Sequence, residues 1–483
     1  MITESPSTGE GLERRTPAEG RLRGRMNALD VTFTVLAYNA PALAFMSFLP
    51  VMILLGNGVG TPVLFVGVGM LLLLVATGLM KMSNTLKRPG GFYAFTTAGL
   101  GKEVGLANGF TSIVAYFAAT VANLVLSGIA FSDMVSGIFG GPEILWPVGS
   151  ALIFVLVAVL GYLNINLSAK MLLVLLGLEL VLVATYCIAV FAQGGANGIS
   201  FDTFEPANIF SGSLAVAVLF GVGLFGGFEA TVIFRDEVKD PDRTIPRATY
   251  GVVALITVLY ATASFALINA YGAETIMSVL GADVVSASGE SIREYVGEPA
   301  YIAAVTLLFT SAVAGSLAGH NILSRYVFNL AADGILPEKL SATHPRHDSP
   351  YKASIVASSA ALVLLIVLAV TMMDNDYLYG YLAGILSYGM LIMVAVVSLA
   401  IGVFLFRKVS GRKVHSAATF LAAAVLILVL VFATLNFDLL SGMTGALGVV
   451  ILVAIWLFIL SGFALAVRLK QRRPDVYARI GRQ

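Results

Sequence analysis

The chain has 483 residues, of which 58% are hydrophobic and only 12% are charged, and its formal net charge is +1. Soluble domains contain about half apolar and about a quarter charged residues, so this composition excludes a water-soluble globular protein. The only cysteine is Cys187, which excludes a disulfide within the chain.

The apolar residues gather in long runs along the whole chain. A run of about 20 apolar residues matches the ~30 Å hydrocarbon core of a bilayer. In chain order these runs predict twelve transmembrane helices and therefore an all-α membrane protein. The predicted spans are residues 28–55, 59–80, 104–132, 147–163, 166–193, 211–235, 248–271, 299–328, 353–373, 377–406, 414–436 and 442–467.

The positions of Lys and Arg support this assignment and give it an orientation. Cytoplasmic segments of membrane proteins are enriched in these two residues. With the N-terminus inside, each of the 29 Lys and Arg residues except Arg293 lies in or beside a predicted cytoplasmic segment. We therefore expect a multi-pass protein of a prokaryotic plasma membrane with both termini in the cytoplasm. Its basic inner face suits membrane lipids with anionic headgroups rather than nucleic acid.

The first span is interrupted by the sequence Asn39-Ala40-Pro41-Ala42. Proline removes a backbone donor and clashes with the carbonyl four residues earlier, so the helix must bend or break here. Asn39 or Ala40 then stands at the N-cap of a second half-helix, with Pro41 in its first turn. The free N–H groups and positive dipole end of such a half-helix receive an anion, for instance a carboxylate.

The sixth span contains a matching cluster of glycines, Gly221, Gly223, Gly226 and Gly227. These glycines permit an unwound segment whose carbonyls accept hydrogen bonds from an ammonium group. Irregular backbone at this depth is tolerated only where it faces protein or a polar cavity. The alternative is that Pro and Gly are simply commoner in membrane helices than in soluble ones.

Paired interruptions in corresponding halves are typical of a transporter binding site. Because five helices separate the two interruptions, the second half must enter the membrane in the opposite direction to the first. We therefore predict a five-plus-five inverted repeat followed by two additional helices. The predicted divisions are a cytoplasmic tail (1–27), the first repeat (28–193), the inverted second repeat (211–406), the two added helices (414–467) and a C-terminal tail (468–483).

Four further side chains are candidates for lining a cavity between these spans. Tyr38 and Phe225 flank the two interruptions, where an aromatic ring can close over a bound solute. Tyr116 and Asn123 are polar residues within the third span. Packing or lipid-facing roles are the alternative for all four.

Three ionisable residues that lie away from the ends of predicted spans are candidates for a functional site. A charged Glu179 in the middle of the fifth span costs about 2.5–3.5 kcal/mol on insertion scales, so its presence indicates a functional site. The alternative is a protonated glutamic acid that is hydrogen-bonded to a neighbouring helix. Glu229 follows the glycines and is a candidate for capping unwound backbone, binding a cation or exchanging a proton. His320, in the eighth span, is either a satisfied core residue or a proton relay.

Several motifs, taken together and in order, resemble the amino acid–polyamine–organocation permease superfamily. They are Pro89-Gly90-Gly91-Phe92-Tyr93, Gly227-Phe228-Glu229, the stretch 236–248, Ser324-Arg325-Tyr326, and the stretch 332–337. The resemblance implies a five-plus-five inverted-repeat fold, a substrate between helices 1 and 6, and alternating access. It also implies amino acids, polyamines or related amines as substrates, and it places the aromatic ring of Phe225 over the substrate.

The chain departs from this superfamily at two places. The Gly-rich break common in helix 1 is replaced here by Asn39-Ala40-Pro41-Ala42, which bears on how a carboxylate is bound. Some proton-coupled members have a lysine in helix 5 at the position that Glu179 occupies here, after Ser168-Ala169-Lys170. We therefore expect Glu179, with His320, to take over the site where other members use a lysine or a sodium ion.

These observations favour a secondary transporter that takes up an amino acid or related amine together with protons. A polyamine or organic-cation carrier and an amino acid exchanger remain alternatives. An intramembrane enzyme would need paired Asp residues, a His-Glu-x-x-His motif or a Ser/His dyad, and none occurs in the sequence. We expect no metal or other cofactor and a proton gradient, rather than sodium, as the driving force. The oligomeric state is left open.

Overall fold

The computed structural model describes residues 26–86, 91–163, 169–347, 349–372, 377–408, 413–443 and 445–481. Over these residues the fold is helical, and the one β-type pairing is an isolated bridge between Met26 and Val238. The long helices are α4 (Thr61–Leu86), α6 (Lys102–Asp133), α7 (Trp146–Tyr162), α8 (Ala169–Gln193), α11 (Pro241–Tyr271), α14 (Glu298–Ala332), α15 (Tyr351–Thr371), α16 (Leu378–Lys408), α17 (Val414–Leu435) and α19 (Ala446–Arg472).

The helices have the length and surface of membrane spans. In the described ranges, nine helical segments are long and apolar enough to cross a bilayer, and α7 and α10 (Leu214–Leu224) are shorter apolar helices. Many large apolar side chains point away from the protein, such as Val370 at 79% exposure and Leu428 at 70%. Outward-facing apolar surface on this scale requires hydrocarbon around it. The protein is therefore an integral multi-pass membrane protein.

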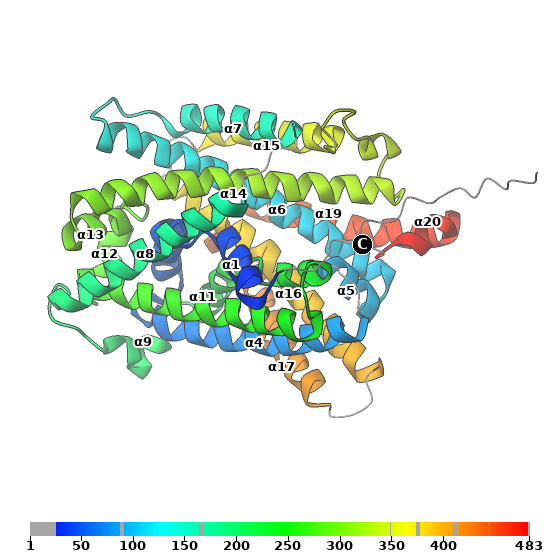
Figure 1. The fold of residues 1–483 in the computed structure, drawn as a ribbon, viewed down its shortest axis with the longest axis horizontal. Coiled ribbons are helices and arrows are strands. Elements are labelled where there is room, and N and C mark those ends of the chain that lie inside the picture. The colour runs from blue at the N-terminus through cyan, green and yellow to red at the C-terminus, as the bar shows by residue number, and fades with distance from the viewer. Residues whose placement is uncertain are drawn as a thin grey trace, which may run out of the picture.

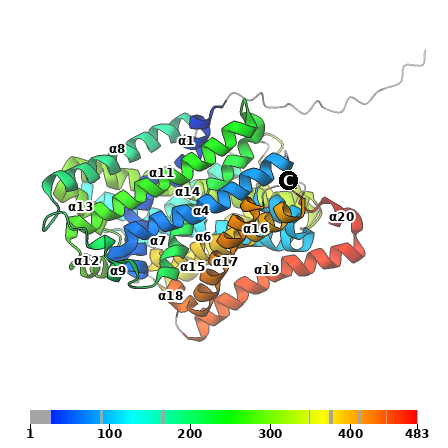
Figure 2. The ribbon, with the colours of Figure 1, turned by 90° about the horizontal axis from the view of Figure 1, so that it is seen from below.

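Short helices mark the two ends of the bundle. The helices α9 (Pro206–Ile209), α12 (Ile276–Ala282) and α13 (Ala287–Tyr295) lie at one end, and α5 (Phe92–Leu100) and α20 (Pro474–Arg479) lie at the other (Figures 1 and 2). We call the second end the basic end, because Lys102, Lys352 and Lys470 lie where helices begin or finish there and Arg325 lies in the last third of α14.

The helices pack in layers around α16. This helix has the most buried membrane segment, 78% of it inside the protein, whereas α19 has only 22% buried and lies on the outside. On the far side of the molecule α7 and α15 pack side by side over α14 (Figure 1). The central position of α16 explains why its sequence shows no polar face.

The first predicted interruption is present. Helix α1 (Ala28–Asn39) ends where Ala40 takes a left-handed conformation with φ of 47°, and α2 (Pro41–Leu43) begins with Pro41 in its first turn. Ala40 is the one non-glycine residue with positive φ among the residues described, and such a conformation costs about 1–2 kcal/mol. The helical path continues through a π-helical turn, Ala44–Phe48, to a second kink at Gly56.

The second predicted interruption is also present. Helix α10 ends at Leu224, and the chain turns through Phe225, Gly226 and Gly227 into a 3₁₀ helix at Phe228–Glu237. Gly227 has φ of 99°, a conformation that only glycine adopts without strain. The first and sixth predicted spans are therefore both broken, at the positions where the sequence predicted an interruption.

Candidate functional site

The two breaks lie against each other. Asn39, the last residue of α1, donates from Nδ2 to the carbonyl of Leu224 at the end of α10, and its Oδ1 accepts the hydroxyl of Tyr260 from α11. A hydrogen bond from the side-chain amide of Asn39 therefore links the backbone at one break to the backbone at the other. The N-cap residue of α2 is Ala40, which has no side-chain cap.

Glu179 reaches the first break from the middle of α8. Its side chain is almost fully buried, with 3% exposure. Its Oε2 accepts the backbone N–H of Ala42 at 3.4 Å, and its Oε1 accepts the hydroxyl of Ser311 from α14. Ala42 lies in the first turn after the break, so one of the N–H groups expected to receive an anion already holds a carboxylate of the protein.

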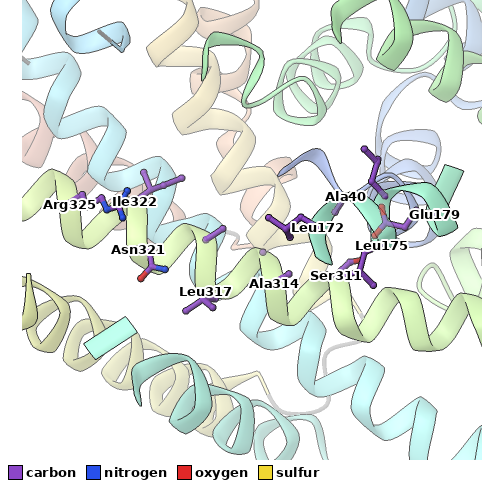
Figure 3. A pocket seen from close by; sticks show the side chains of 13 residues that line it. Ala40, Leu172, Leu175, Glu179, Ser311, Ala314, Leu317, Asn321, Ile322 and Arg325 are labelled. Atoms are coloured by element: carbon purple, nitrogen blue, oxygen red, sulfur yellow. Dashed lines mark hydrogen bonds between the residues drawn. The ribbon is translucent and has the colours of Figure 1, made fainter. Parts of the chain in front are cut away.

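A cavity of about 260 Å³ begins at this carboxylate. Glu179, Ser311 and Ala40 lie at one end of it, and Asn321, Ile322 and Arg325 lie at the other (Figure 3). The side chains between them are mostly apolar and come from one face of α8 and one face of α14. From Ser311 to Arg325 the rise of α14 spans about 21 Å. The cavity therefore connects the breaks with the basic end.

Arg325 is the charged residue at the outer end of this cavity. Its side chain is exposed and makes no hydrogen bond or ion pair with any residue in the described ranges. Glu179 at the inner end carries the opposite charge when it is ionised. The cavity is thus polar at its two ends and apolar between them.

His320 lies on the opposite face of α14 from this cavity. Its Nε2 is 2.9 Å from Ser354 Oγ of α15, and its ring packs on Gly161 of α7. The structure therefore does not bring His320 to Glu179. A coupling role for His320 stays a prediction.

The remaining candidates have mixed surroundings. The ring of Tyr116 stacks on Tyr326 with centroids 5.8 Å apart, and Asn123 packs against Gly315 in the wall of the cavity. Phe225 is fully buried. At Gly221, an added Cβ would lie 2.9 Å from Val68 Cγ2, so this glycine lets α10 approach α4 closely.

Two candidates and part of one motif cannot be placed. The side chains of Tyr38 and Glu229 lie outside the described residues, as do Pro89 and Gly90. Over the ranges that are described, no three His, Cys, Asp or Glu side chains come together to hold a metal ion.

Three residues of the site were not predicted as site residues. Ser311 and Tyr260 are single polar residues in apolar spans, where most hydroxyls bond to their own helix, so the sequence contains no signal for their longer-range contacts. Arg325 belongs to a quoted motif, but the motif alone does not indicate that it lines a cavity. Their proximity to the breaks emerges only from the packing of α8, α11 and α14.

Comparison with known proteins gives the family. A family model described as amino acid permease matches residues 31–463. An uncharacterized transporter of Mycobacterium tuberculosis is 25% identical over 71% of this chain and 74% of its own length. In Bacillus subtilis, the serine/threonine exchanger SteT is 24% identical over 62% of this chain and 66% of its own length. The branched-chain amino acid permease BcaP of the same organism is 26% identical over 62% of this chain and 65% of its own length.

The family model and the named relatives show that this multi-pass helical bundle is a membrane transporter and not an enzyme. The chain is a member of the amino acid permease family. This membership confirms the predicted resemblance to the amino acid–polyamine–organocation permeases.

Proposed function

We propose that this protein is a secondary transporter that carries an amino acid or a related amine by alternating access and couples the movement to protons. The observation that carries the proposal is the position of Glu179, whose carboxylate lies at the first break and at the inner end of the cavity. The relatives named as an amino acid permease and as a serine/threonine exchanger support this substrate class.

The proposed architecture has twelve spans in a five-plus-five inverted repeat, with both termini in the cytoplasm of a prokaryotic cell. The contact between the breaks of α1 and α10 supports the pairing of the two halves. The basic end, which has α5 and α20, then faces the cytoplasm, in agreement with the enrichment of Lys and Arg there. The cavity is accordingly the cytoplasmic route to the site.

We propose that Glu179 couples substrate to protons by competition for one anion site. The ionised carboxylate of Glu179 accepts the N–H of Ala42 and opposes a second carboxylate nearby, because like charges a few ångströms apart repel strongly in a buried site. Protonation removes this charge and frees the N–H for the carboxylate of a substrate. Proton binding therefore favours substrate binding, and by linkage substrate binding favours proton binding.

A carrier of polyamines or other organic cations is the second candidate. In that case the ionised carboxylate of Glu179 binds the ammonium group of the substrate directly. The observation that favours this candidate is that the chain's own carboxylate already occupies the N–H of Ala42, which leaves the inner end of the cavity anionic. Proton coupling then has the opposite sign, because protonation of Glu179 weakens cation binding.

Uptake into proteoliposomes tests both candidates. We expect amino acids, rather than diamines, to compete with the transported substrate, and uptake to rise with an inward proton gradient but not with a sodium gradient. In Glu179→Gln the gradient should no longer drive accumulation, whereas Gly177→Ala, a change on the same helix where no atom lies within 4 Å of the added Cβ, should still be driven. Gradient-driven accumulation that persists in Glu179→Gln rejects Glu179 as the coupling group. Competition by diamines alone, with tighter binding at high pH, establishes the cation carrier instead.

Exchange is distinguished from symport in the same vesicles. For a symporter, we expect uptake into empty vesicles when only a proton gradient is present. Uptake that requires amino acid inside the vesicles identifies an exchanger, the activity named for the Bacillus subtilis relative.

A further inference from the structure

A second cavity, of about 360 Å³, lies between α7 and α15 on the side of α14 away from the Glu179 cavity. Its walls are mainly apolar and include Phe154, Val159, Ile355 and Leu362. Val159 and Ile355 are about half exposed, at 50% and 49%, so the cavity is a groove open to the surrounding hydrocarbon. The groove has no charged residue in its wall, which excludes a zwitterionic substrate as its occupant.

Two hydroxyl groups in the groove have no hydrogen-bond partner within the described part of the chain. Ser358 and Ser359 line it, and neither side chain makes a hydrogen bond with any residue that the structure describes. Elsewhere on α15, Thr371 donates to the carbonyl of Val367 at 2.7 Å and Ser354 pairs with His320. A hydroxyl without a partner in an apolar environment is unfavourable. The two serines therefore call for a ligand that brings acceptor oxygens into the hydrocarbon region.

The groove leads to positive charge at the basic end. Tyr162 lines the groove, and its ring contacts the ring of Tyr351 with centroids 6.0 Å apart. The Nζ of Lys352 lies 5.8 Å from the ring centroid of Tyr351. Lys352 is six to seven residues before the two serines on α15, a rise of about 10 Å. Aromatic residues and lysine at a membrane boundary mark the level of the headgroups.

We propose that this groove binds a phospholipid with an anionic headgroup. One acyl chain lies in the part of the groove lined by Phe154 and Leu362, the ester carbonyls accept hydrogen bonds from Ser358 and Ser359, and the phosphate faces Lys352. Along α15 from Leu362 back to Lys352, the apolar wall comes first, then the two serines and then the lysine. Acyl chain, ester and phosphate follow one another in the same order in a lipid. A second protein chain would cover the apolar walls but would not supply ester acceptors beside a lysine.

Photo-crosslinking in nanodiscs tests this site in the full-length protein. The probes are phosphatidylglycerol and phosphatidylcholine, each with a photoreactive acyl chain, and the labelled residues are identified by mass spectrometry. We expect phosphatidylglycerol to label Phe154 and Leu362, which line the groove on the side of the serines away from Lys352, more densely than Val363, which is 63% exposed on the same helix but outside the groove. Phosphatidylcholine should label the groove less than phosphatidylglycerol does.

Substitutions separate the parts of the site. Lys352→Gln should lower phosphatidylglycerol labelling of the groove about fivefold, the equivalent of one lysine–headgroup attraction. Lys413→Gln, altered at a basic residue that precedes α17 and lies outside the groove, should not change it. Ser358→Ala with Ser359→Ala should lower the labelling by both lipids, because both contain ester carbonyls. Unchanged labelling at Val363 shows that each variant is folded.

Three results overturn the proposal. Labelling of the groove that is no denser than at Val363 rejects a bound lipid. Equal labelling by the two lipids, unaffected by Lys352→Gln, rejects the anionic headgroup. Crosslinks from groove residues to a second copy of the chain assign the groove to a protein interface.

Discussion

Asn39 joins three helices at the first break through one side-chain amide. Asn39→Ala leaves the hydroxyl of Tyr260 and the carbonyl of Leu224 without their partner, and each unsatisfied buried group costs about 1–3 kcal/mol. We expect a lower thermal unfolding midpoint for Asn39→Ala in detergent. Tyr260→Phe, which leaves the bond to Leu224 intact, should lower it less. A midpoint for Asn39→Ala that is no lower than for Tyr260→Phe contradicts this account.

Gly161 makes room for the ring of His320. An added Cβ would lie 2.5 Å from His320 Cδ2, so either the ring or α7 must move. We expect Gly161→Ala to destabilise the protein by about 1–3 kcal/mol, the usual effect of overpacking, measured as a lower unfolding midpoint. The matched control is Gly177→Ala on α8, where no atom lies within 4 Å of the added Cβ. Its midpoint should be unchanged or higher, since alanine favours helix over glycine.

At the level of single residues, the sequence predicts which groups are unusual but not what they contact. Glu179 is conspicuous because an acid in an apolar span is costly. Its acceptance of bonds from Ala42 and Ser311 depends on residues more than one hundred positions away, and no local pattern encodes such pairs. His320 is equally conspicuous, yet it faces Ser354 and Gly161 because of where α7 and α15 pack.

At the level of elements, the breaks were predictable because they have a local cause. Pro41 and the glycines around Gly227 act through backbone sterics within a few residues, which periodicity and composition reveal. The short helices α5 and α20 were not predicted, because each depends on contacts with distant segments: α5 packs on α6 and α16, and α20 packs on α19 and is hydrogen-bonded to α6. The π-helical turn at Ala44–Phe48 was also not predicted, since nothing in its residue types distinguishes it from an α-helical turn.

Helix α20 is held to α6 by a small polar cluster. The Nζ of Lys102 donates to the carbonyls of Tyr477 and Ala478 at 3.0 and 2.9 Å. Glu103 accepts from Lys470 Nζ and from the hydroxyl of Tyr477, both at 2.9 Å. These contacts secure the C-terminal segment at the basic end.

Alkaline pH should release this segment. Burial and the bond to Glu103 raise the pKa of Tyr477 above its ordinary value of 10.0. The hydroxyl therefore donates fully below pH 10 and stops donating as the pH rises through the raised pKa. We expect trypsin to cleave after Arg472 and after Arg479 faster above this pH. In Tyr477→Phe, cleavage at neutral pH should be about threefold faster, from the loss of roughly 0.5–1 kcal/mol.

The same variant provides the control for the alkaline experiment. Because Tyr477→Phe has no hydroxyl to titrate, its cleavage rate at these sites should change less with pH than that of the unmodified protein. An equal alkaline increase in both proteins would show that another group releases α20.

At the level of the whole molecule, the cavity from Glu179 extends along α14 as far as Arg325, toward the basic end. Leu172 lines it, whereas Val174, two residues further along α8, is 56% exposed to the hydrocarbon. We expect Leu172→Cys to react with a charged thiol reagent added at the basic end but not when it is added at the opposite end. Val174→Cys should react from neither end, because charged reagents do not enter hydrocarbon.

The protein is well suited to this measurement, since its single natural cysteine, Cys187, is buried. The assigned direction of the cavity is contradicted if Leu172→Cys reacts equally with reagent added at either end. It is also contradicted if Leu172→Cys reacts only with reagent added at the end that has α13. The sequence predicted that a cavity lies near the breaks, but not its direction. That direction follows from which residues of α8 and α14 line the cavity between Glu179 and Arg325, and this depends on how the two helices pack in the bundle.

If substrate and Glu179 compete for the N–H of Ala42 as we propose, the ionised carboxylate inhibits substrate binding in the resting protein. A solute that needs the N–H of Ala42 must first displace Glu179, so its apparent affinity is reduced by the fraction of molecules in which that group is ionised. A search for tighter binders among variants would therefore favour Glu179→Gln, the form that we expect to have lost its drive. In this permease, improved affinity and impaired pumping should arise from one and the same substitution.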